Sequence, residues 1–270
     1  MSVRSIEGFF LGELIFIGLG LHDESGVSLR GITDAKESEV AYIELYTNSM
    51  PELSLKRLED LIGKRPQMLS RDDLEERSNE SILKEASRKR VALLVPGDPM
   101  IATTHITLRI AAERMGIKTR VVHGASIISA AIGLSGLQNY KFGRSVTIPF
   151  PGNDKPSETP YEVLRENRSL GLHTLVFLDV RVEEGRSMRI HEGLEILSSI
   201  ESKRMEEVIS NVMIVVGIAR AGSDRPVVKA GRLRELLTFE FGDAPHILIF
   251  PGRLHFMEEE ALKVLGGYQK

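Results

Sequence analysis

The carboxylate of Asp98, at the end of an apolar run, is the side chain in this sequence best placed to do chemistry. Residues 91–95 are apolar, and Pro96, Gly97, Asp98 and Pro99 follow them directly. The run predicts a buried strand that ends at Pro96 and Gly97. Asp98 can cap a helix and Pro99 suits its first position, so we expect a helix from Pro99 onward. In open α/β sheets ligands bind at the carboxyl ends of strands, which makes Asp98 a candidate ligand contact.

The segment 17–23 begins like a dinucleotide-binding fingerprint, with the sequence Ile-Gly-Leu-Gly-Leu-His-Asp. The fingerprint fails because Asp23 stands where a third glycine is required. We therefore interpret Gly18 and Gly20 as a tight turn that lets a ligand approach the backbone. The sequence also contains no G-x-x-x-x-G-K-[ST] and no G-x-S-x-G, which argues against a P-loop nucleotide hydrolase and an α/β-hydrolase.

Two further strand ends carry small residues. In the segment 121–130, Gly124 and Ser126 follow an apolar pair and open a helical pattern. Ser126 can contact a ligand or serve as an ordinary helix N-cap. In the segment 215–222, Ala221 lies among small residues past a third apolar run. Small residues at several strand ends predict one ligand cleft that is built from several loops.

The histidines show no metal-ligand spacing. They are His22, His105, His123, His173, His191, His246 and His255. None forms H-E-x-x-H, so a surface or hydrogen-bonded structural role is the ordinary interpretation, and no metal is expected. His246 is the strongest functional candidate among them, because it follows Pro245 and enters the apolar run 247–250. The chain has no cysteine, which excludes disulfides, thiol catalysis and cysteine-ligated metal sites.

These residues require elements that position them, and the apolar pattern predicts alternating strands and helices. In the first half we expect strands at 14–18, 41–46, 91–95 and 119–122, and helices at 28–35, 53–62, 82–87 and from 99 onward. The last of these helices should place Ile106, Ile110 and Ala111 on one face. It should also pair Arg109 with Glu113.

The alternation resumes in the second half. We expect strands at 146–148, 174–179, 212–218 and 246–250, and helices at 191–200 and 256–265. The pattern predicts an α/β protein: two α/β domains with mainly parallel or mixed sheets and a cofactor cleft between them. Residues 1–124 should form an N-terminal α/β domain with the Gly97-Asp98-Pro99 motif, and residues 125–270 a C-terminal α/β domain that completes the cofactor and substrate cleft. Residues 149–160, rich in proline and polar groups, predict a surface connection or a lid.

Composition narrows the class of partner. The 270 residues are 42 % hydrophobic and 27 % charged, with a net charge of −3, as in ordinary globular proteins. That charge gives no field favouring nucleic acid or an anionic membrane. Residues 9–21 form the longest apolar run, but Glu13 interrupts it well short of the ~20 residues that span a bilayer. We therefore expect no direct nucleic acid and no membrane partner. The absence of cysteine fits a cytoplasmic location.

Six segments, in order along nearly the whole chain, resemble the diphthine synthase family. They are GLGL at 18–21, PGDPMIATTH at 96–105, HGASII at 123–128, HTLVFLDV at 173–180, ARAG at 219–222 and PHILIFPG at 245–252. The family belongs to the tetrapyrrole-methylase-like class of S-adenosylmethionine-dependent methyltransferases. This sequence is similar to the archaeal type. The part that differs is the extra N-terminus, roughly residues 1–13, and the family suggests no role for it.

The resemblance implies a fold and an activity. The expected fold is two α/β domains around a cleft. A homodimer is also expected. The expected activity is methylation of the amino group on the modified histidine of translation elongation factor 2, a step in diphthamide biosynthesis. The cofactor would be S-adenosyl-L-methionine, with S-adenosyl-L-homocysteine as its product. The archaeal type is expected to stop at the trimethylated form, diphthine.

The resemblance also implies which residues bind the cofactor. The implied contacts are Leu21, Asp98, Ile101, Ser126, Ile127, Leu178, Ala221 and His246. Four of these, Asp98, Ser126, Ala221 and His246, are candidates from their own sequence context. By pattern alone, Leu178 and Ile127 would be assigned to the core. No catalytic residue is identified, and solvent water could accept the proton of the amine.

Two other functions stay open at this point. One is a related methyltransferase that acts on a corrin or tetrapyrrole precursor, which needs a broad enclosed trough. The other is a non-catalytic dimer that binds the nucleoside as a signal. A protein substrate, in contrast, needs a cleft mouth that can admit a loop.

Overall fold

The structure is a computed structural model that describes residues 12–78, 81–152 and 155–269. The chain divides into two compact units, Met1–Ser126 and Ile127–Lys270. Nearly all of the N-terminal extension named above lies outside the described residues. Within the described ranges, no helix is both long and apolar enough to cross a membrane.

The first unit contains a five-stranded sheet in the order β3-β2-β4-β1-β5, and every pair of neighbours is parallel. The strands are β1 (Glu13–Gly18), β2 (Val40–Glu44), β3 (Gln67–Leu69), β4 (Arg90–Val95) and β5 (Lys118–Val122). Leu14, Ile15, Phe16 and Ile17 of β1 are all fully buried. A continuous apolar run of this kind is typical of a parallel strand with helices on both faces of its sheet.

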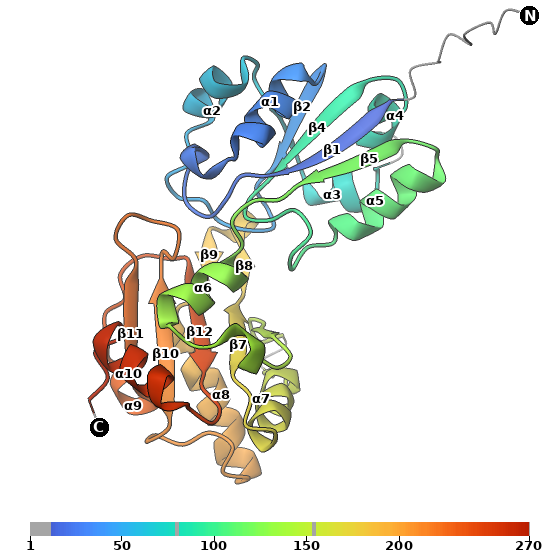
Figure 1. The fold of residues 1–270 in the computed structure, drawn as a ribbon. Coiled ribbons are helices and arrows are strands. Elements are labelled where there is room, and N and C mark those ends of the chain that lie inside the picture. Colours follow the sequence, from blue (N-terminus) through green and yellow to red (C-terminus); the bar gives the residue numbers. More distant parts are fainter. Residues whose placement is uncertain (1–11, 79–80, 153–154, 270) are drawn as a thin grey trace, which may run out of the picture. The chain divides into compact units, whose positions relative to one another are not determined.

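Helices cover both faces of this sheet (Figure 1). One face carries α1 (Leu29–Glu37) and α2 (Leu55–Ile62); the other carries α3 (Arg71–Glu75), α4 (Ile82–Ala86) and α5 (His105–Arg114). A short 3₁₀ turn, Glu24–Gly26, precedes α1. The chain thus leaves the neighbouring strands β1 and β4 toward opposite faces. In doubly wound sheets this arrangement opens a crevice at the carboxyl ends of those two strands.

The second unit contains a mixed sheet in the order β11-β10-β12-β7-β6. Its strands are β6 (Val146–Ile148), β7 (Thr174–Leu178), β10 (Ile214–Ala219), β11 (Val227–Arg232) and β12 (His246–Phe250), and a separate hairpin pairs β8 (Val180–Arg181) with β9 (Arg186–Ser187). Only β6 and β7 are parallel; the other three pairs are antiparallel.

Helices also cover both faces of the second sheet (Figure 1). One face packs against α6 (Ile127–Ser135) and α10 (Phe256–Val264), and the other against α7 (Thr159–Ser169), α8 (Ile190–Arg204) and α9 (Leu233–Leu236). Short 3₁₀ turns occur at Asn139–Lys141 and Val182–Glu184. The predicted fold class, two α/β domains with parallel or mixed sheets, is confirmed.

The predicted start of the helix after Pro99 is wrong, because α5 begins six residues later, at His105. The N–H of Ile101 donates to the carbonyl of Asp98 at 3.3 Å, which closes a single turn. Ala102 then adopts a φ of 55°, in the left-handed region, so the turn cannot continue as a right-handed helix.

The apolar face predicted for this helix is not the face that packs against the sheet. The residues of α5 that face the sheet are His105, Leu108 and Ala112, whereas Ile106 and Ile110 are 50 % and 45 % exposed. The expected pair of Arg109 with Glu113 is replaced by contacts of both side chains with Thr119, at the start of β5. These bonds fix α5 against the strand that follows it.

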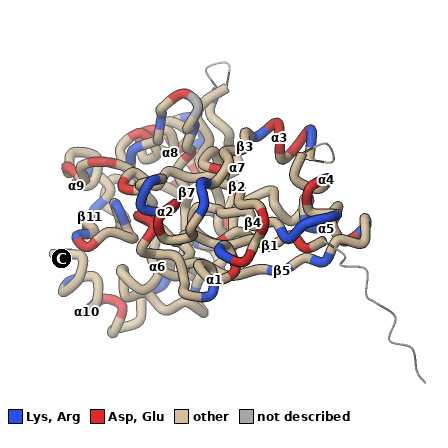
Figure 2. Tube along the Cα trace, turned by 90° about the horizontal axis from the view of Figure 1, so that it is seen from above, with Lys and Arg blue, Asp and Glu red and all other residues tan. Residues whose placement is uncertain are grey.

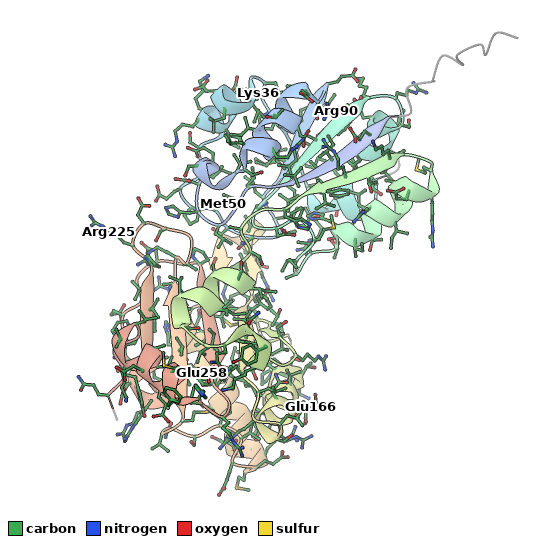
Figure 3. All side chains as sticks on the ribbon, viewed as in Figure 1. Lys36, Met50, Arg90, Glu166, Arg225 and Glu258 are labelled. Atoms are coloured by element: carbon green, nitrogen blue, oxygen red, sulfur yellow. The ribbon has the colours of Figure 1, made fainter. Side chains whose placement is uncertain are left out.

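Charges of both signs are interspersed on the first unit. Figure 2 shows basic and acidic residues side by side along α3 and α5. At the amino ends of its strands, the carboxylate of Asp34 is 2 % exposed and binds the guanidinium groups of Arg90 at 3.0 Å and Arg120 at 2.5 Å. Arg90, labelled in Figure 3, also reaches Glu13 and Glu37. This ion cluster ties β1, β4, β5 and α1 together at the edge opposite the crevice.

Candidate active site

Three neighbouring strands of the first sheet end in glycines whose backbones touch. Gly20 and Gly97, after β1 and β4, exchange two backbone hydrogen bonds of 3.2 and 2.6 Å. A Cβ atom on Gly18 would lie 2.5 Å from the nitrogen of Gly124 and 2.6 Å from the carbonyl oxygen of Gly97. Glycine is therefore required where the ends of β4, β1 and β5 meet. An added Cβ on Gly97 would meet nothing within 4 Å, so this backbone has an open side that a ligand can approach.

Asp98 lies just past this junction and is only 6 % exposed. Its Oδ1 accepts the N–H of Met100 at 2.9 Å, and its Oδ2 lies 2.7 Å from Nδ1 of His123. Because β1 lies between β4 and β5 in the sheet, the contact between Asp98 and His123 joins the two loops that flank the end of β1. Each carboxylate oxygen can accept a second hydrogen bond, so Asp98 retains capacity for a cation or hydroxyl group of a ligand.

The two ring nitrogens of His123 differ in their surroundings. A carboxylate only accepts hydrogen bonds, so Nδ1 carries the proton and donates it to Asp98. In the neutral ring Nε2 then has a free lone pair, and within the described ranges no hydrogen bond to it is found. The side chain of His123 is 72 % exposed, so Nε2 has access to solvent. A proton acceptor held in one orientation therefore lies at the carboxyl end of β5.

A buried polar pair lies under the loop that carries Asp98. His105 and Glu44 are exposed by 1 % and 0 %, and Nδ1 of His105 donates to the carbonyl of Pro99 at 3.2 Å. Burial lowers the pKa of His105 and raises the pKa of Glu44. The carboxylate of Glu44 accepts the backbone N–H groups of Tyr46 and Thr47 at 3.0 and 3.1 Å. His105 thus supports the loop from inside the unit instead of facing a ligand.

The four predicted contacts of the first unit all follow these strand ends. Leu21 comes after β1, Asp98 and Ile101 after β4, and Ser126 after β5. Ile101 is 38 % exposed, which leaves its side chain accessible to a ligand. Sequence positions spread over about a hundred residues are thus gathered at one edge of one sheet.

Three of the four predicted contacts in the second unit share one edge of the second sheet. Leu178 ends β7, Ala221 follows the end of β10, and His246 begins β12. Because β12 is antiparallel to both neighbours, its start lies at the edge where they end, and His246 pairs in register with Ala219. Ile127 is the first residue of α6, packed against the sheet.

The ring of His246 is used within its own unit. Nδ1 accepts the N–H of Ile190, at the start of α8, at 3.3 Å. Nε2 donates to the carbonyls of Gly242 and Asp243, each at 3.1 Å. A ring that accepts at Nδ1 is neutral, and burial lowers the pKa of His246 accordingly. Any ligand contact at this residue would therefore be made by its backbone or by a ring carbon.

Arg220 holds the same loop from the end of β10. It adopts a φ of 50°, and its backbone N–H donates to the carbonyl of Pro245 at 2.9 Å. Its guanidinium donates to the carbonyls of Phe241 at 3.0 Å and Asp243 at 2.8 Å. Arg220 and His246 thus fix the loop 241–245 beside Ala221.

The second unit also contains a cavity of about 780 Å³ at the opposite edge of its sheet. Thr174 at the start of β7, Ile214 at the start of β10 and Phe250 at the end of β12 line it. None of the eight predicted contacts lines this cavity. Within the described ranges, no group of three or more His, Asp or Glu side chains is arranged to hold a metal ion.

Two features of this arrangement were not predicted from the sequence. Arg220 was given no role, and His123 was left among the six histidines without an assigned function. A usable signal existed for His123, which comes directly after the buried end of β5 and directly before Gly124. No comparable signal existed for Arg220, because its partners lie in a loop that is irregular in sequence.

Comparison with known proteins assigns the family. Residues 13–237 match the model of the Tetrapyrrole (Corrin/Porphyrin) Methylases. The diphthine synthase of Methanocella arvoryzae is 47 % identical over 94 % of this chain and 98 % of its own length, and that of Methanosarcina mazei is 49 % identical over 92 % and 94 %. The chain belongs to the diphthine synthase family. A crystal structure of a diphthine synthase, 41 % identical, covers 95 % of this chain and 97 % of its own with a TM-score of 0.87.

The predicted family and enzyme class are thereby confirmed. As a member of the diphthine synthase family, the chain is an S-adenosylmethionine-dependent methyltransferase that acts at the methylation step of diphthamide biosynthesis. The strand ends described above fit such a cofactor. They offer an open backbone at Gly97, a buried carboxylate at Asp98 with free acceptor capacity, and an exposed apolar side chain at Ile101.

Proposed function

We propose that this chain methylates the amino group of the modified histidine on translation elongation factor 2 and produces the trimethylated form, diphthine. The observation that carries the proposal is the near full-length identity with diphthine synthases, together with a first-unit strand edge that fits the cofactor. The same near full-length identity argues against the two alternatives, a corrin methylase and a non-catalytic nucleoside-binding dimer.

We propose that the cofactor contacts of the first unit are Leu21, Asp98, Ile101 and Ser126. S-adenosyl-L-methionine supplies an electrophilic methyl group on a sulfonium, and S-adenosyl-L-homocysteine is the product. Leu21 and Ile101 would pack against the apolar parts of the cofactor. Asp98 would accept from its hydroxyl or amino groups and complement its positive charge. The same role is proposed for Ile127, Leu178, Ala221 and His246 of the second unit.

The residues around the reacting atoms have a limited task. A sulfonium is already activated, so the protein must mainly hold the amine in line with the methyl group. The amine must be neutral to attack, and a site that excludes water favours the neutral form. No covalent attachment to a protein side chain is required, which agrees with the absence of cysteine.

The partners and the location are also proposals. The substrate is a protein, elongation factor 2, and the enzyme works as a homodimer in the cytoplasm without direct contact to nucleic acid or a membrane. Sedimentation equilibrium of the purified chain checks the homodimer. A monomer mass at all concentrations would contradict it.

Incubation with unmethylated elongation factor 2 tests the function. We expect the intact mass of elongation factor 2 to rise in steps of one methyl group and to stop at the third. Methylation of a corrin precursor but not of elongation factor 2 would favour the tetrapyrrole enzyme. Tight cofactor binding without transfer to either substrate would favour the binding protein.

Substitution of Asp98 tests the cofactor site. We expect Asp98→Ala to weaken S-adenosylmethionine binding at least about tenfold, because a buried, charged acceptor is lost. Isothermal calorimetry measures the affinity, and thermal unfolding shows whether the fold persists. Asp72→Ala, which removes an exposed carboxylate from α3, is the matched control. Normal affinity in Asp98→Ala would overturn the assignment.

A further inference from the structure

We propose that His123 is the general base that takes the proton from the amine nucleophile, and that Asp98 is its positioning residue. The inference rests on the proposed function, because it concerns the same methyl transfer. It adds a catalytic residue to a site for which the sequence identified none.

The balance of the reaction requires a proton acceptor in every round. At neutral pH an alkyl amine carries an extra proton, and its nitrogen has no lone pair until that proton leaves. The neutral nitrogen then forms a bond to the methyl carbon while the carbon–sulfur bond breaks, and that electron pair stays on sulfur. Each methyl group transferred to the ammonium form thus releases one proton. Three successive transfers release three.

The Asp98–His123 contact has the geometry that such a base needs. Oδ2 of Asp98 lies 2.7 Å from Nδ1 of His123, which fixes the proton on Nδ1 and the lone pair on Nε2. Asp98 is itself held by the N–H of Met100, so the orienting carboxylate is not free to rotate. The same logic of a carboxylate that selects the histidine tautomer operates in hydrolytic triads.

The unequal exposure of the two side chains also suits repeated proton transfer. Asp98 is 6 % exposed, so its hydrogen bond to His123 is shielded from competing water, whereas the side chain of His123 is 72 % exposed. A base that works once per methyl group must return to its neutral form between rounds. The exposed ring of His123 can do so by releasing its proton to solvent.

Two other histidines of the described chain, His246 and His105, fit this role less well. The two ring nitrogens of His246 bind Ile190 and the loop carbonyls, and His105 is buried beneath the loop. His123, in contrast, keeps one nitrogen without a protein partner in the described ranges. It lies beside the junction of glycines where β4, β1 and β5 end.

Ionisable groups lie on both loops beside His123. On the loop after β4 the relevant group is Asp98, and on the loop after β1 they are His22 and Asp23. Asp23 accepts from the backbone and hydroxyl of Ser25, within its own loop. The pH dependence assigned to His123 should therefore change when Asp98 is altered and persist when His22 is altered.

The first experiment measures the tautomer of His123 in the protein without substrate. Nitrogen-15 NMR of histidine-labelled protein, assigned by comparison with His123→Gln, should show the proton on Nδ1 at pH 8. In Asp98→Asn the amide can donate, so we expect the proton to move to Nε2. A wild-type ring protonated at Nε2 would overturn the proposal, because that nitrogen could not accept a proton.

The second experiment measures the first methyl transfer to elongation factor 2 at saturating cofactor. We expect His123→Gln to lose about 100-fold in rate at pH 7, to keep its cofactor affinity, and to recover as the pH rises. Free imidazole should partly restore His123→Ala. The double variant Asp98→Asn with His123→Gln should be no slower than His123→Gln alone, since the two residues act as a unit.

The matched control is His191→Gln, which removes a histidine on α8 and should leave the rate and its pH profile unchanged. A wild-type rate and pH profile in His123→Gln would overturn the inference while leaving the proposed function intact. Absence of any methylation of elongation factor 2 by the wild-type chain would instead overturn the proposed function, and the inference with it.

Discussion

Each unit has loops at the ends of its strands, and different interactions fix these loops in the two units. In the first unit the loops after β1, β4 and β5 meet through the backbones of Gly18, Gly97 and Gly124. In the second unit the side chains of Arg220 and His246 hold the loop that precedes β12.

Sheet topology explains this difference. All strands of the first sheet run the same way, so their carboxyl ends meet at one edge without other elements between them. In the second sheet β12 enters at the edge where β7 and β10 end, and the extra loop has to be fixed by side-chain donors. The first edge should therefore be sensitive to added volume, and the second to the loss of a donor or to acid.

The largest expected effect comes from adding one carbon atom to the first edge. We expect Gly18→Ala to destabilise the protein by about 3 kcal/mol and to abolish measurable cofactor binding, because the new Cβ would overlap the backbones of Gly97 and Gly124. Urea unfolding and calorimetry measure the two effects. Gly133→Ala, in α6, is the control, since its Cβ would meet nothing within 4 Å. Equal stability of both variants would contradict the volume argument.

The second-largest effect is expected at the amino-terminal edge of the first sheet, and it should change stability without changing cofactor binding. Asp34→Asn should cost roughly 2 kcal/mol in the free energy of unfolding, because two partly buried guanidinium groups lose their shared carboxylate. Cofactor affinity should not change, since Asp34 lies at the amino ends of the strands. Glu37→Gln, which removes an exposed partner of Arg90, is a milder control. A loss of affinity in Asp34→Asn would show that the two edges are coupled.

A smaller effect is expected at the second edge. Arg220→Met keeps the length of the side chain but removes the donors to Phe241 and Asp243, which should cost about 1 kcal/mol in stability. If the loosened loop is part of the cofactor site, affinity should fall by about fivefold, the equivalent of that energy. Arg225→Met is the control, because Figure 3 shows Arg225 projecting from the loop between β10 and β11. Equal stability and equal cofactor affinity in the two variants would contradict the proposal that Arg220 fixes the loop.

The smallest effect is the response to acid. Burial lowers the pKa of His246 in the folded protein, so the unfolded chain binds a proton more readily. This histidine therefore contributes stability that is complete above the unfolded pKa of about 6.5 and is lost as the pH falls through the lower, folded value. Urea unfolding at pH 8, 7, 6 and 5 should give a smaller loss of stability in His246→Gln than in the wild type. A steeper loss in His246→Gln would reverse the sign and contradict the argument.

The burial of His173 adds to the same acid sensitivity in the second unit. Its Nδ1 accepts the N–H of Gly252 and its Nε2 lies 2.9 Å from Glu258, which Figure 3 labels. Burial lowers the pKa of His173 as well, while the lysine and backbone donors around Glu258 hold the pKa of that carboxyl at about 2. In the first unit burial also lowers the pKa of His105, which favours a loss of stability in acid. Burial raises the pKa of Glu44, which has the opposite effect on stability as the pH falls.

Much of the fold follows from local sequence. Strands β6 and β12 begin and end where the sequence predicts, because buried apolar runs there are bounded by turn residues. The three-residue strand β3 and the short helix α3 were not predicted, since neither is long enough to show a period. Helix α5 shows a different limit. Its apolar residues satisfy helical spacing on two faces, and local spacing alone does not show that the face with His105, Leu108 and Ala112 packs on the sheet.

The candidate site was predictable only in its parts. Each of Gly18, Gly97 and Gly124 could be recognised as a turn at a strand end. Their mutual contact depends on the order β4-β1-β5, which no local pattern specifies. For the same reason, the bond between Asp98 and His123 could not be foreseen, because it links residues 25 positions apart across a third strand.

The central position of β1 has a consequence for how the chain folds. Its partners are β4 and β5, so one edge of β1 cannot pair until Arg90 has been synthesised, and the other edge cannot pair until Lys118 has been synthesised. At a synthesis rate of about 5–20 residues per second, that delay lasts on the order of ten seconds. Throughout it, the apolar strand from Leu14 to Ile17 has at least one unpaired edge, and an unpaired apolar edge can template aggregation until residue 122 has emerged.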